Sequence, residues 1–312
     1  MVWIASFKNL VICRFFCDQY SELKPAIMKT LVWIISLFLF CPLLTAQSAW
    51  TLEKNHWYTQ IGFTNIGPYN ELFVNGSDKR EIPFEITDNT LQFYGEYGLL
   101  DKLTLSLSLP LKFIRTNSQA STLNAVIASE SVSVLGNISF GIKRKLYDNK
   151  IVISSSFVID ANTSQYFKDS GIRTGYDAWT FLPSISFGKG TDKYFLQGSL
   201  GMGLRTNNYS HYLNLKGEVG YKFFNRFWTI FYMDYKDSFE NGTILLPVNN
   251  LTTSLYVNNQ EYLGYGIKVI AELNSSVGIT SGFGGALTAN SEARKAALNL
   301  GVYFKLSTKK NE

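Results

Sequence analysis

One stretch, residues 91–113, constrains the fold of this chain more than any other. It holds two runs of alternating residues on either side of a short polar turn, 98–102. In the second run the odd-numbered positions are all apolar: Leu103, Leu105, Leu107, Leu109, Leu111 and Phe113. Most even-numbered positions are polar: Thr104, Ser106, Ser108 and Lys112. Successive side chains of a strand point to opposite faces, so this pattern predicts a hairpin with one apolar and one polar face.

The same alternation recurs along the chain after residue 50. The predicted strands are 57–63, 91–97, 103–113, 132–146, 151–159, 179–187, 194–204, 211–223, 227–235, 262–272, 277–283 and 296–306. Most of them have the length of about 10 residues that a tilted transmembrane strand needs. We therefore expect an all-β fold of about twelve strands.

The connections between these strands alternate in length. The short ones are 98–102, 147–150, 188–192, 224–226 and 272–276, and the long ones are 67–89, 116–130, 160–178, 237–259 and 285–295, with 206–210 as the exception. An even number of antiparallel strands with short turns at one end and long loops at the other is typical of outer-membrane barrels. The sequence thus predicts a transmembrane up-and-down antiparallel β-barrel over residues 50–306.

The composition agrees with a barrel and disfavours a helical membrane protein. The chain is 46% hydrophobic and 17% charged, as expected where apolar outward residues alternate with polar inward ones. No run of about 20 apolar residues follows residue 46. The net charge of +5 is mild, and no long basic run or nucleic-acid motif is present, so we expect no nucleic-acid partner.

The N-terminus has the form of an export signal. Met28-Lys29-Thr30 is a short basic start, residues 31–44 are an apolar core, and small residues follow. We predict a cleaved signal peptide at 28–49, preceded by an upstream extension at 1–27 that is not part of the mature protein. An ordered N-terminal domain is the alternative, but 27 residues with one short apolar run are too few for a core.

All three cysteines lie before the predicted cleavage site, at positions 13, 17 and 41. The mature chain would then have no disulfide and no thiol metal site. No spacing of metal ligands or phosphate-binding loop is present either, so we expect no metal and no cofactor.

The faces of the strands follow from the cost of charge in lipid. A lysine at the bilayer midplane on the outer face costs about 2–4 kcal/mol, so Lys216 and Glu218 should face the lumen. The odd-numbered leucines from Leu103 to Leu109 should face lipid. Within 132–146 we expect Val132 and Val134 on the same face as Phe140. Pro183 cannot donate a ladder hydrogen bond, so we expect a bulge or a rim position there.

The inward parity supplies the candidate site residues. The lumen-lining candidates are Glu96, Ser106, Ser108, Lys143, Lys216, Glu218, Lys222 and Lys268. Further charged residues of inward parity are Lys112, Arg205 and Lys305. Many other inward positions are small serines and threonines, which leave room for a channel. Because basic candidates outnumber acidic ones, an open pore would favour anionic or polar solutes. The alternative is that the charges pair with one another and stiffen a closed barrel.

Catalytic groups are scarce. A nucleophilic enzyme needs a base near its nucleophile, and the two histidines, His56 and His211, fall at opposite ends of the predicted barrel. We therefore predict that the protein is not an enzyme. An outer-membrane lipid-modifying enzyme is the third of our hypotheses, after a channel and an adhesive barrel.

The last predicted strand contains a second signature of the outer membrane. Residues 299–306, NLGVYFKL, resemble the C-terminal signal that barrel proteins present to the insertion machinery, which would be a partner of this chain together with outer-membrane lipid. Many such proteins end on phenylalanine, whereas this chain continues with a short tail, 307–312.

Two motifs carry a resemblance to a known family. They are YGEYGLLDKLT at 94–104 with Leu109-Pro110, and Thr174-Gly175-Tyr176 before FLPS at 181–184. With these motifs the chain resembles the outer-membrane barrels associated with phenol meta-pathway degradation, which are related in style to FadL-like transporters. The resemblance implies passage of small solutes, hydrophobic compounds among them. We predict a passive channel or transporter with a small solute in its lumen. The alternative is a structural or adhesive barrel whose long loops bind a partner.

Overall fold

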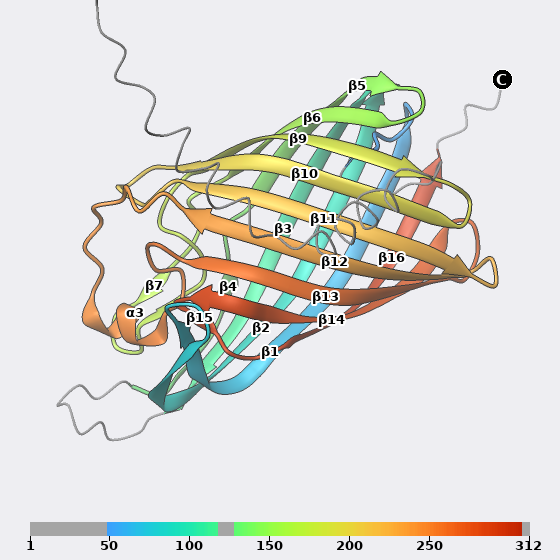
Figure 1. Cartoon of the computed structure of the whole chain (residues 1–312). Coiled ribbons are helices and arrows are strands. Elements are labelled where there is room, and N and C mark those ends of the chain that lie inside the picture. The colour runs from blue at the N-terminus through green and yellow to red at the C-terminus, as the bar shows by residue number, and fades with distance from the viewer. Residues whose placement is uncertain (1–48, 118–127, 308–312) are drawn as a thin grey trace, which may run out of the picture. The chain divides into compact units, whose positions relative to one another are not determined.

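The computed structural model describes residues 49–117 and 128–307, which form a closed antiparallel β-barrel of twelve strands (Figure 1). Each wall strand pairs with its neighbours in chain order, and β1 pairs with both β2 and β16. This last pairing closes the sheet, so that the wall leaves no edge strand with unpaired backbone groups. The predicted fold class is confirmed.

The elements have the following bounds. The wall strands are β1 (His56–Val74), β2 (Asp78–Leu100), β3 (Leu103–Thr116), β5 (Ser139–Asp148), β6 (Val152–Asp160), β9 (Thr180–Gly190), β10 (Tyr194–Arg205), β11 (Tyr212–Phe223), β12 (Phe227–Ser238), β13 (Glu261–Glu272), β14 (Val277–Asn290) and β16 (Ala297–Ser307). The connections of the described chain contain β4 (Glu130–Leu135), β7 (Tyr166–Phe167), β8 (Ile172–Arg173), α3 (Val248–Thr253) and β15 (Glu292–Ala293). Among the described residues, no helix is long and apolar enough to cross a membrane.

The two ends of the barrel differ as predicted. The connections β2–β3, β5–β6, β9–β10, β11–β12 and β13–β14 are short and share one end, which we call the turn end. The long connections, with α3, β7 and β15, gather at the other end, which we call the loop end (Figure 1). The short connection 206–211 also lies at the loop end, as the sequence predicted.

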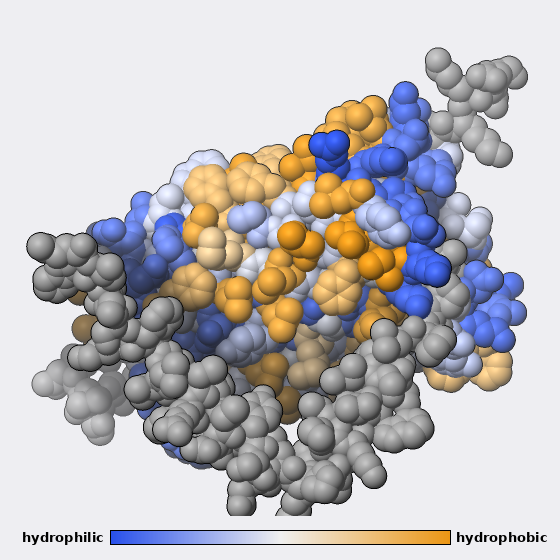
Figure 2. Space-filling model, turned by 45° about the horizontal axis from the view of Figure 1, so that its top comes forward, coloured by the Kyte–Doolittle hydropathy of each residue, from blue (hydrophilic) through white to orange (hydrophobic). Residues whose placement is uncertain are grey.

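The outer face of the barrel is an apolar band. Large apolar side chains of the outward parity are exposed on most strands, among them Ile61, Leu105, Ile185, Leu215 and Leu300. Figure 2 shows hydrophobic side chains across the middle of one face of the wall, with hydrophilic residues toward both ends. Aromatic pairs stand at the turn end, where the rings of Trp57 and Tyr97 lie 4.3 Å apart. An apolar band bounded by amphipathic rings matches a lipid bilayer.

The prediction of a loop at 67–89 is wrong for most of these residues, which belong to strands. Instead β1 and β2 continue beyond the other strands as a hairpin whose turn is Asn75-Gly76, both with positive φ. The sequence does not reveal these strands, because many of their residues are polar and face solvent. The inward residues Leu72, Ile82, Phe84 and Ile86 are buried in an apolar cluster, which stabilises the extension. β14 likewise extends into the predicted loop 285–295.

The predicted strand 132–146 is interrupted, and its faces switch. Residues 136–138 stand opposite only Leu109 and Pro110 of β3, so one extra residue enters this side of the pair. Val132 and Val134 therefore face inward, opposite Ile114 and Lys112, whereas Phe140 faces outward, opposite Leu107. The expectation of one common face is wrong, because a one-residue shift exchanges the two faces of a strand.

Pro183 lies within β9 without the expected bulge. Its register to Phe157 of β6 is unbroken. The ladder to β10 pairs Phe181 with Leu204 and Ser184 with Gly201 in one continuous register, and the two residues between them are left out of the ladder. Pro183 has no N–H group to donate, and the strand accommodates it by a gap in the hydrogen bonds to β10. No extra residue is inserted, so no bulge forms.

The predicted upstream extension 1–27 lies outside the described residues, as do residues 28–48 of the predicted signal peptide and residues 308–312 of the predicted tail. These assignments remain predictions. The described chain begins at Ala49.

The two faces of β3 should respond differently to the same charge. We expect Leu105→Lys to lower the free energy of unfolding from a bilayer by about 2–4 kcal/mol, because the ammonium would replace an exposed apolar side chain in lipid. Ser106→Lys, on the inner face, should cost clearly less. Urea unfolding in lipid vesicles measures both values, and equal losses would contradict the assignment of the faces.

Candidate functional site

The lumen contains two neighbouring cavities of about 320 and 290 Å³. The predicted site residues Lys216, Glu218 and Lys268 line the larger cavity. Ser106, Lys143 and again Lys216 line the smaller one. Since Lys216 belongs to both walls, the two cavities adjoin along the middle of β11.

Most of the cavity charges form pairs between nearby strands, β11 with β12 in one case and β11 with β13 in the other. Lys216 Nζ lies 3.3 Å from Asp234 Oδ2, and Lys268 Nζ lies 3.5 Å from Glu218 Oε1. The other oxygen of Glu218 accepts a hydrogen bond of 2.6 Å from Gln197. These pairs are partly exposed to the cavity, so solvent screens them and their stabilising effect is small.

The other predicted site residues lie toward the turn end or on the wall. Lys143 Nζ lies 3.2 Å from Glu96 Oε1, and Lys222 Nζ lies 2.6 Å from Glu272 Oε2. Ser108 accepts a hydrogen bond of 2.7 Å from Gln92. The structure thus distributes the eight candidates along the lumen and does not gather them at one point.

The N-terminal segment, residues 49–53, lies across the turn end inside the barrel. The amide of Leu52 donates to Thr104 Oγ1 of β3 at 2.8 Å, and the carbonyl of Trp50 accepts from Lys143 Nζ of β5 at 3.1 Å. On the far side the ring of Trp50 stands edge-on to Phe195 of β10. The segment therefore spans from one side of the wall to the other.

Two glycines make room for the N-terminal segment. A Cβ atom on Gly98 would collide with the carbonyl oxygen of Glu53, and one on Gly188 would collide with Ala49 and Trp50. Ala49 is fully buried. Such close backbone approach requires glycine, so the wall is shaped to hold this segment.

The loop end is covered by a layer that we call the roof: Tyr176, Arg205, Tyr212, Lys236 and Gln260. The Arg205 guanidinium lies between two rings, with its carbon 3.6 Å from the Tyr176 centroid and 4.4 Å from the Tyr212 centroid. The hydroxyl of Tyr176 donates to Gln260 Oε1 at 2.6 Å and accepts from Lys236 Nζ at 3.1 Å. Cation–π and hydrogen-bond contacts thus join β10, β11 and β12 to two loops.

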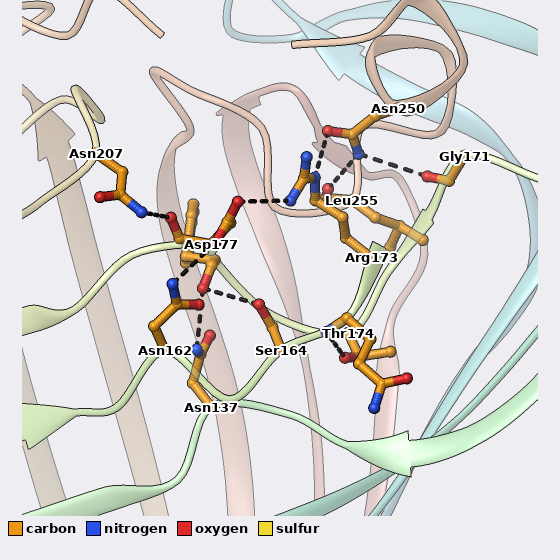
Figure 3. A network of polar contacts seen from close by, with 12 residues as sticks. Asn137, Asn162, Ser164, Gly171, Arg173, Thr174, Asp177, Asn207, Asn250 and Leu255 are labelled. Carbon is orange, nitrogen blue, oxygen red and sulfur yellow. Dashed lines mark hydrogen bonds and ion pairs between the residues drawn. The ribbon is translucent and has the colours of Figure 1, made fainter. Parts of the chain in front are cut away.

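A polar network that includes Asn137, Ser164 and Asn250 (Figure 3) holds the loop that carries Tyr176. The side chains of Asn137 and Ser164 both donate to the Tyr176 carbonyl, at 3.0 Å each. Farther along the loop, Arg173 Nε donates to Asn250 Oδ1 at 2.8 Å. The side-chain amide of Asn250 in turn donates to the carbonyls of Leu255 and Gly171.

Below the hairpin of β1 and β2, an apolar cluster attaches the loops to the wall. Its buried members are Tyr69, Leu72, Ile82, Phe84, Ile86, Ile114, Val132, Ile172 and Leu255. These residues come from β1, β2, β3, β4, β8 and the residues after α3. The roof is therefore anchored by a small hydrophobic core as well as by polar contacts.

Sequence reasoning missed most of the roof. It identified Arg205 as inward, but it ended the predicted strand at residue 235, whereas Lys236 belongs to β12. The shared parity of Asp234 and Lys236 could have set the inward face of that strand. Tyr176 and Gln260 could not have been found in this way, because loop residues follow no period.

The described residues offer little for catalysis. His56 begins β1 at the turn end, and His211 precedes β11 at the loop end, where its Nδ1 accepts from the Arg205 amide. Within the part of the chain that the structure describes, no three histidine, cysteine or acidic side chains come together as metal ligands do.

Comparisons with known proteins support the fold. No family model matches the sequence, and no curated protein matches it. The structure resembles an outer-membrane channel from Pseudomonas putida F1, with a TM-score of 0.62 and 12% identity over 85% of this chain and 100% of that one. It also matches the NanC porin (TM-score 0.49, 6% identity, 80% of this chain and 100% of that one) and the CymD monoaromatic hydrocarbon channel (0.39, 8%, 84% and 90%). At these identities the likeness concerns the fold alone.

The closed wall, the apolar band and the sorting of the connections together define the class of the protein. It is a porin-like β-barrel of the outer membrane. In such barrels the short turns face the periplasm and the long loops face the exterior. The N-terminal segment therefore lies at the periplasmic mouth, and the roof lies at the extracellular mouth.

The loop network should control the mobility of the roof without affecting the wall. Asn250→Ala removes the acceptor of Arg173 Nε and the side-chain donor to the Leu255 carbonyl, a cost of about 1–3 kcal/mol. We expect amide exchange in residues 160–178 to become about tenfold faster or more, while exchange in the strands is unchanged. Asn162→Ala, which removes only an exposed contact to Asp177, is the control. Equal effects of the two variants would contradict the network.

Proposed function

We propose that this protein is a narrow passive channel for small solutes across the outer membrane, and that its lumen-lining residues contact the solute. The observation that carries the proposal is the polar cavity space inside the closed wall, between the N-terminal segment and the roof. A barrel of purely structural function has no need of interior cavities with charged walls. The fold likeness to an outer-membrane channel supports the same function.

The resemblance in the turn motifs extends the proposal to hydrophobic compounds. The described lumen is mainly polar along β11 and β12, so we expect polar and charged solutes to pass as well. Outer-membrane lipid surrounds the wall, and the last strand, β16, would engage the barrel-insertion machinery during assembly. No catalytic step is required for this function.

The N-terminal segment would restrict the pore at the periplasmic mouth. We expect Trp50→Ala to increase the mean conductance of the protein in planar bilayers, because its ring occupies the space beside Phe195. Trp57→Ala removes the same side chain from the outer face and should leave the conductance unchanged. A reconstituted, folded barrel with neither conductance nor solute flux would overturn the channel and favour the adhesive alternative.

One carboxyl group of the extracellular loops faces the cations of the roof. Glu292 belongs to β15, beyond the apolar band, and is half-buried. Burial raises the pKa of Glu292 to about 7, against the opposing effects of Lys236, Arg205 and Lys112. Its carboxyl is therefore neutral in mildly acidic solution and ionised in mildly alkaline solution.

This titration should make the ion selectivity depend on pH. Below pH 7 the protonated Glu292 no longer offsets the neighbouring cations, so the preference for anions should be greater at pH 5.5 than at pH 8.5. Reversal potentials in a salt gradient measure the change. Glu292→Gln should hold the channel in its more anion-selective state at both values, and an unaltered pH dependence in this variant would exclude Glu292 as the titrating group.

A further inference from the structure

Five cations of the described chain are less than a tenth exposed: Lys112, Lys143, Arg173, Arg205 and Lys236. The first three each have a carboxylate oxygen within 4.0 Å, on Asp88, Glu96 and Asp177 respectively. Arg205 and Lys236 have no carboxylate of the described residues within that distance. A buried cation without an anion is costly, so these two are exceptional.

The two cations occupy the same place in the roof. Arg205 lies over the rings of Tyr176 and Tyr212, and Lys236 Nζ lies 5.3 and 5.1 Å from the same two ring centroids. They come from β10 and β12, with β11 between them, so the roof brings two positive charges together. Ring faces reduce the cost of burying a cation, but they do not neutralise its charge.

The hydrogen-bonding capacity of this pair is not exhausted. Arg205 Nε is buried and has no hydrogen-bond partner within the described structure. The carboxylates of Asp160 and Glu292 interact electrostatically with Arg205 only from beyond ion-pair distance. A free donor and an incompletely balanced positive charge, both buried, are the features of a site that receives an anion.

The pair adjoins the space through which a solute would pass. Lys236 is the next inward residue of β12 after Asp234, which lines the larger cavity. Its cross-strand neighbour on β11, Asn214, lines the smaller cavity. An anion held by the pair would therefore lie between the roof and the cavities.

We propose that Arg205 and Lys236 form a binding site for the carboxylate group of a small organic anion that uses the channel. The guanidinium presents paired N–H donors in a plane, which match a carboxylate, and the lysine ammonium supplies a second positive charge. The tyrosines of the roof surround this point and offer apolar ring edges to the remainder of the solute. This inference rests on the proposed channel function for its biological meaning, but the binding itself can be tested separately.

Equilibrium binding to the folded, full-length protein in detergent tests the site. Isothermal titration with acetate, benzoate and inorganic phosphate would compare the wild type with Arg205→Gln and Lys236→Gln. We expect each variant to bind the carboxylates roughly tenfold more weakly or worse. Lys79→Gln is the charge-matched control, because Lys79 is exposed on the hairpin and paired with Glu71, and it should bind as the wild type does. Heat-modifiable gel mobility shows that each variant is folded.

The outcomes separate this inference from the proposed function. Carboxylate binding that both variants lose supports the site, whether or not the protein conducts. Absence of carboxylate binding in a conducting wild type would overturn the site and leave the channel intact. Tighter binding of phosphate than of either carboxylate, or equal binding by the wild type and both variants, would also overturn it. Arg205→Lys keeps the charge but loses the planar donors, so its affinity should fall between those of the wild type and Arg205→Gln.

Discussion

The pairing of β1 with β16 is the interaction on which the rest of this structure depends. In lipid, each unpaired backbone group of an open sheet would cost several kcal/mol, so the sheet must close on itself. Closure places the first and last wall strands side by side in a continuous register from Ile66–Ala297 to His56–Ser307. It also creates an inside and an outside, and every side chain of the wall is assigned to one of them by its parity.

This assignment explains the distribution of charge. Lys216, Glu218, Asp234 and Lys268 lie on the inner face, where they form the pairs Lys216–Asp234 and Lys268–Glu218. This pairing leaves the middle of the lumen close to neutral. The loop end differs, since Arg205 and Lys236 share two aromatic rings but have no carboxylate of the described chain at ion-pair distance. The electrostatic character of the pore is thus decided mainly at its extracellular mouth.

The two mouths are covered by different means. At the periplasmic mouth a short backbone segment crosses the barrel and is fixed by two hydrogen bonds, an aromatic contact and glycines that leave space for it. At the extracellular mouth long loops fold inward over an apolar cluster and a polar network. The N-terminal segment is held by a few contacts to the wall, whereas the roof is attached through contacts from several strands and loops.

The sequence correctly predicted the number of wall strands, the sorting of short and long connections, and the inward parity of residues such as Lys216 and Arg205. These properties are local, because a period of two and a turn motif can each be recognised within a few consecutive residues. The prediction of faces failed at residues 136–138, opposite Pro110, which has no N–H group to donate. One added residue there places Val132 and Phe140 on opposite faces.

The closure of the lumen and the position of the cations that are unpaired within the described chain depend on tertiary contacts. Tyr176, Arg205 and Lys236 meet from a loop and two strands, and Trp50 reaches Phe195 across the barrel. Contacts of this kind join residues far apart in the chain and depend on the closure of the sheet. No periodic pattern encodes them, since a loop residue has no fixed face until the wall beneath it exists.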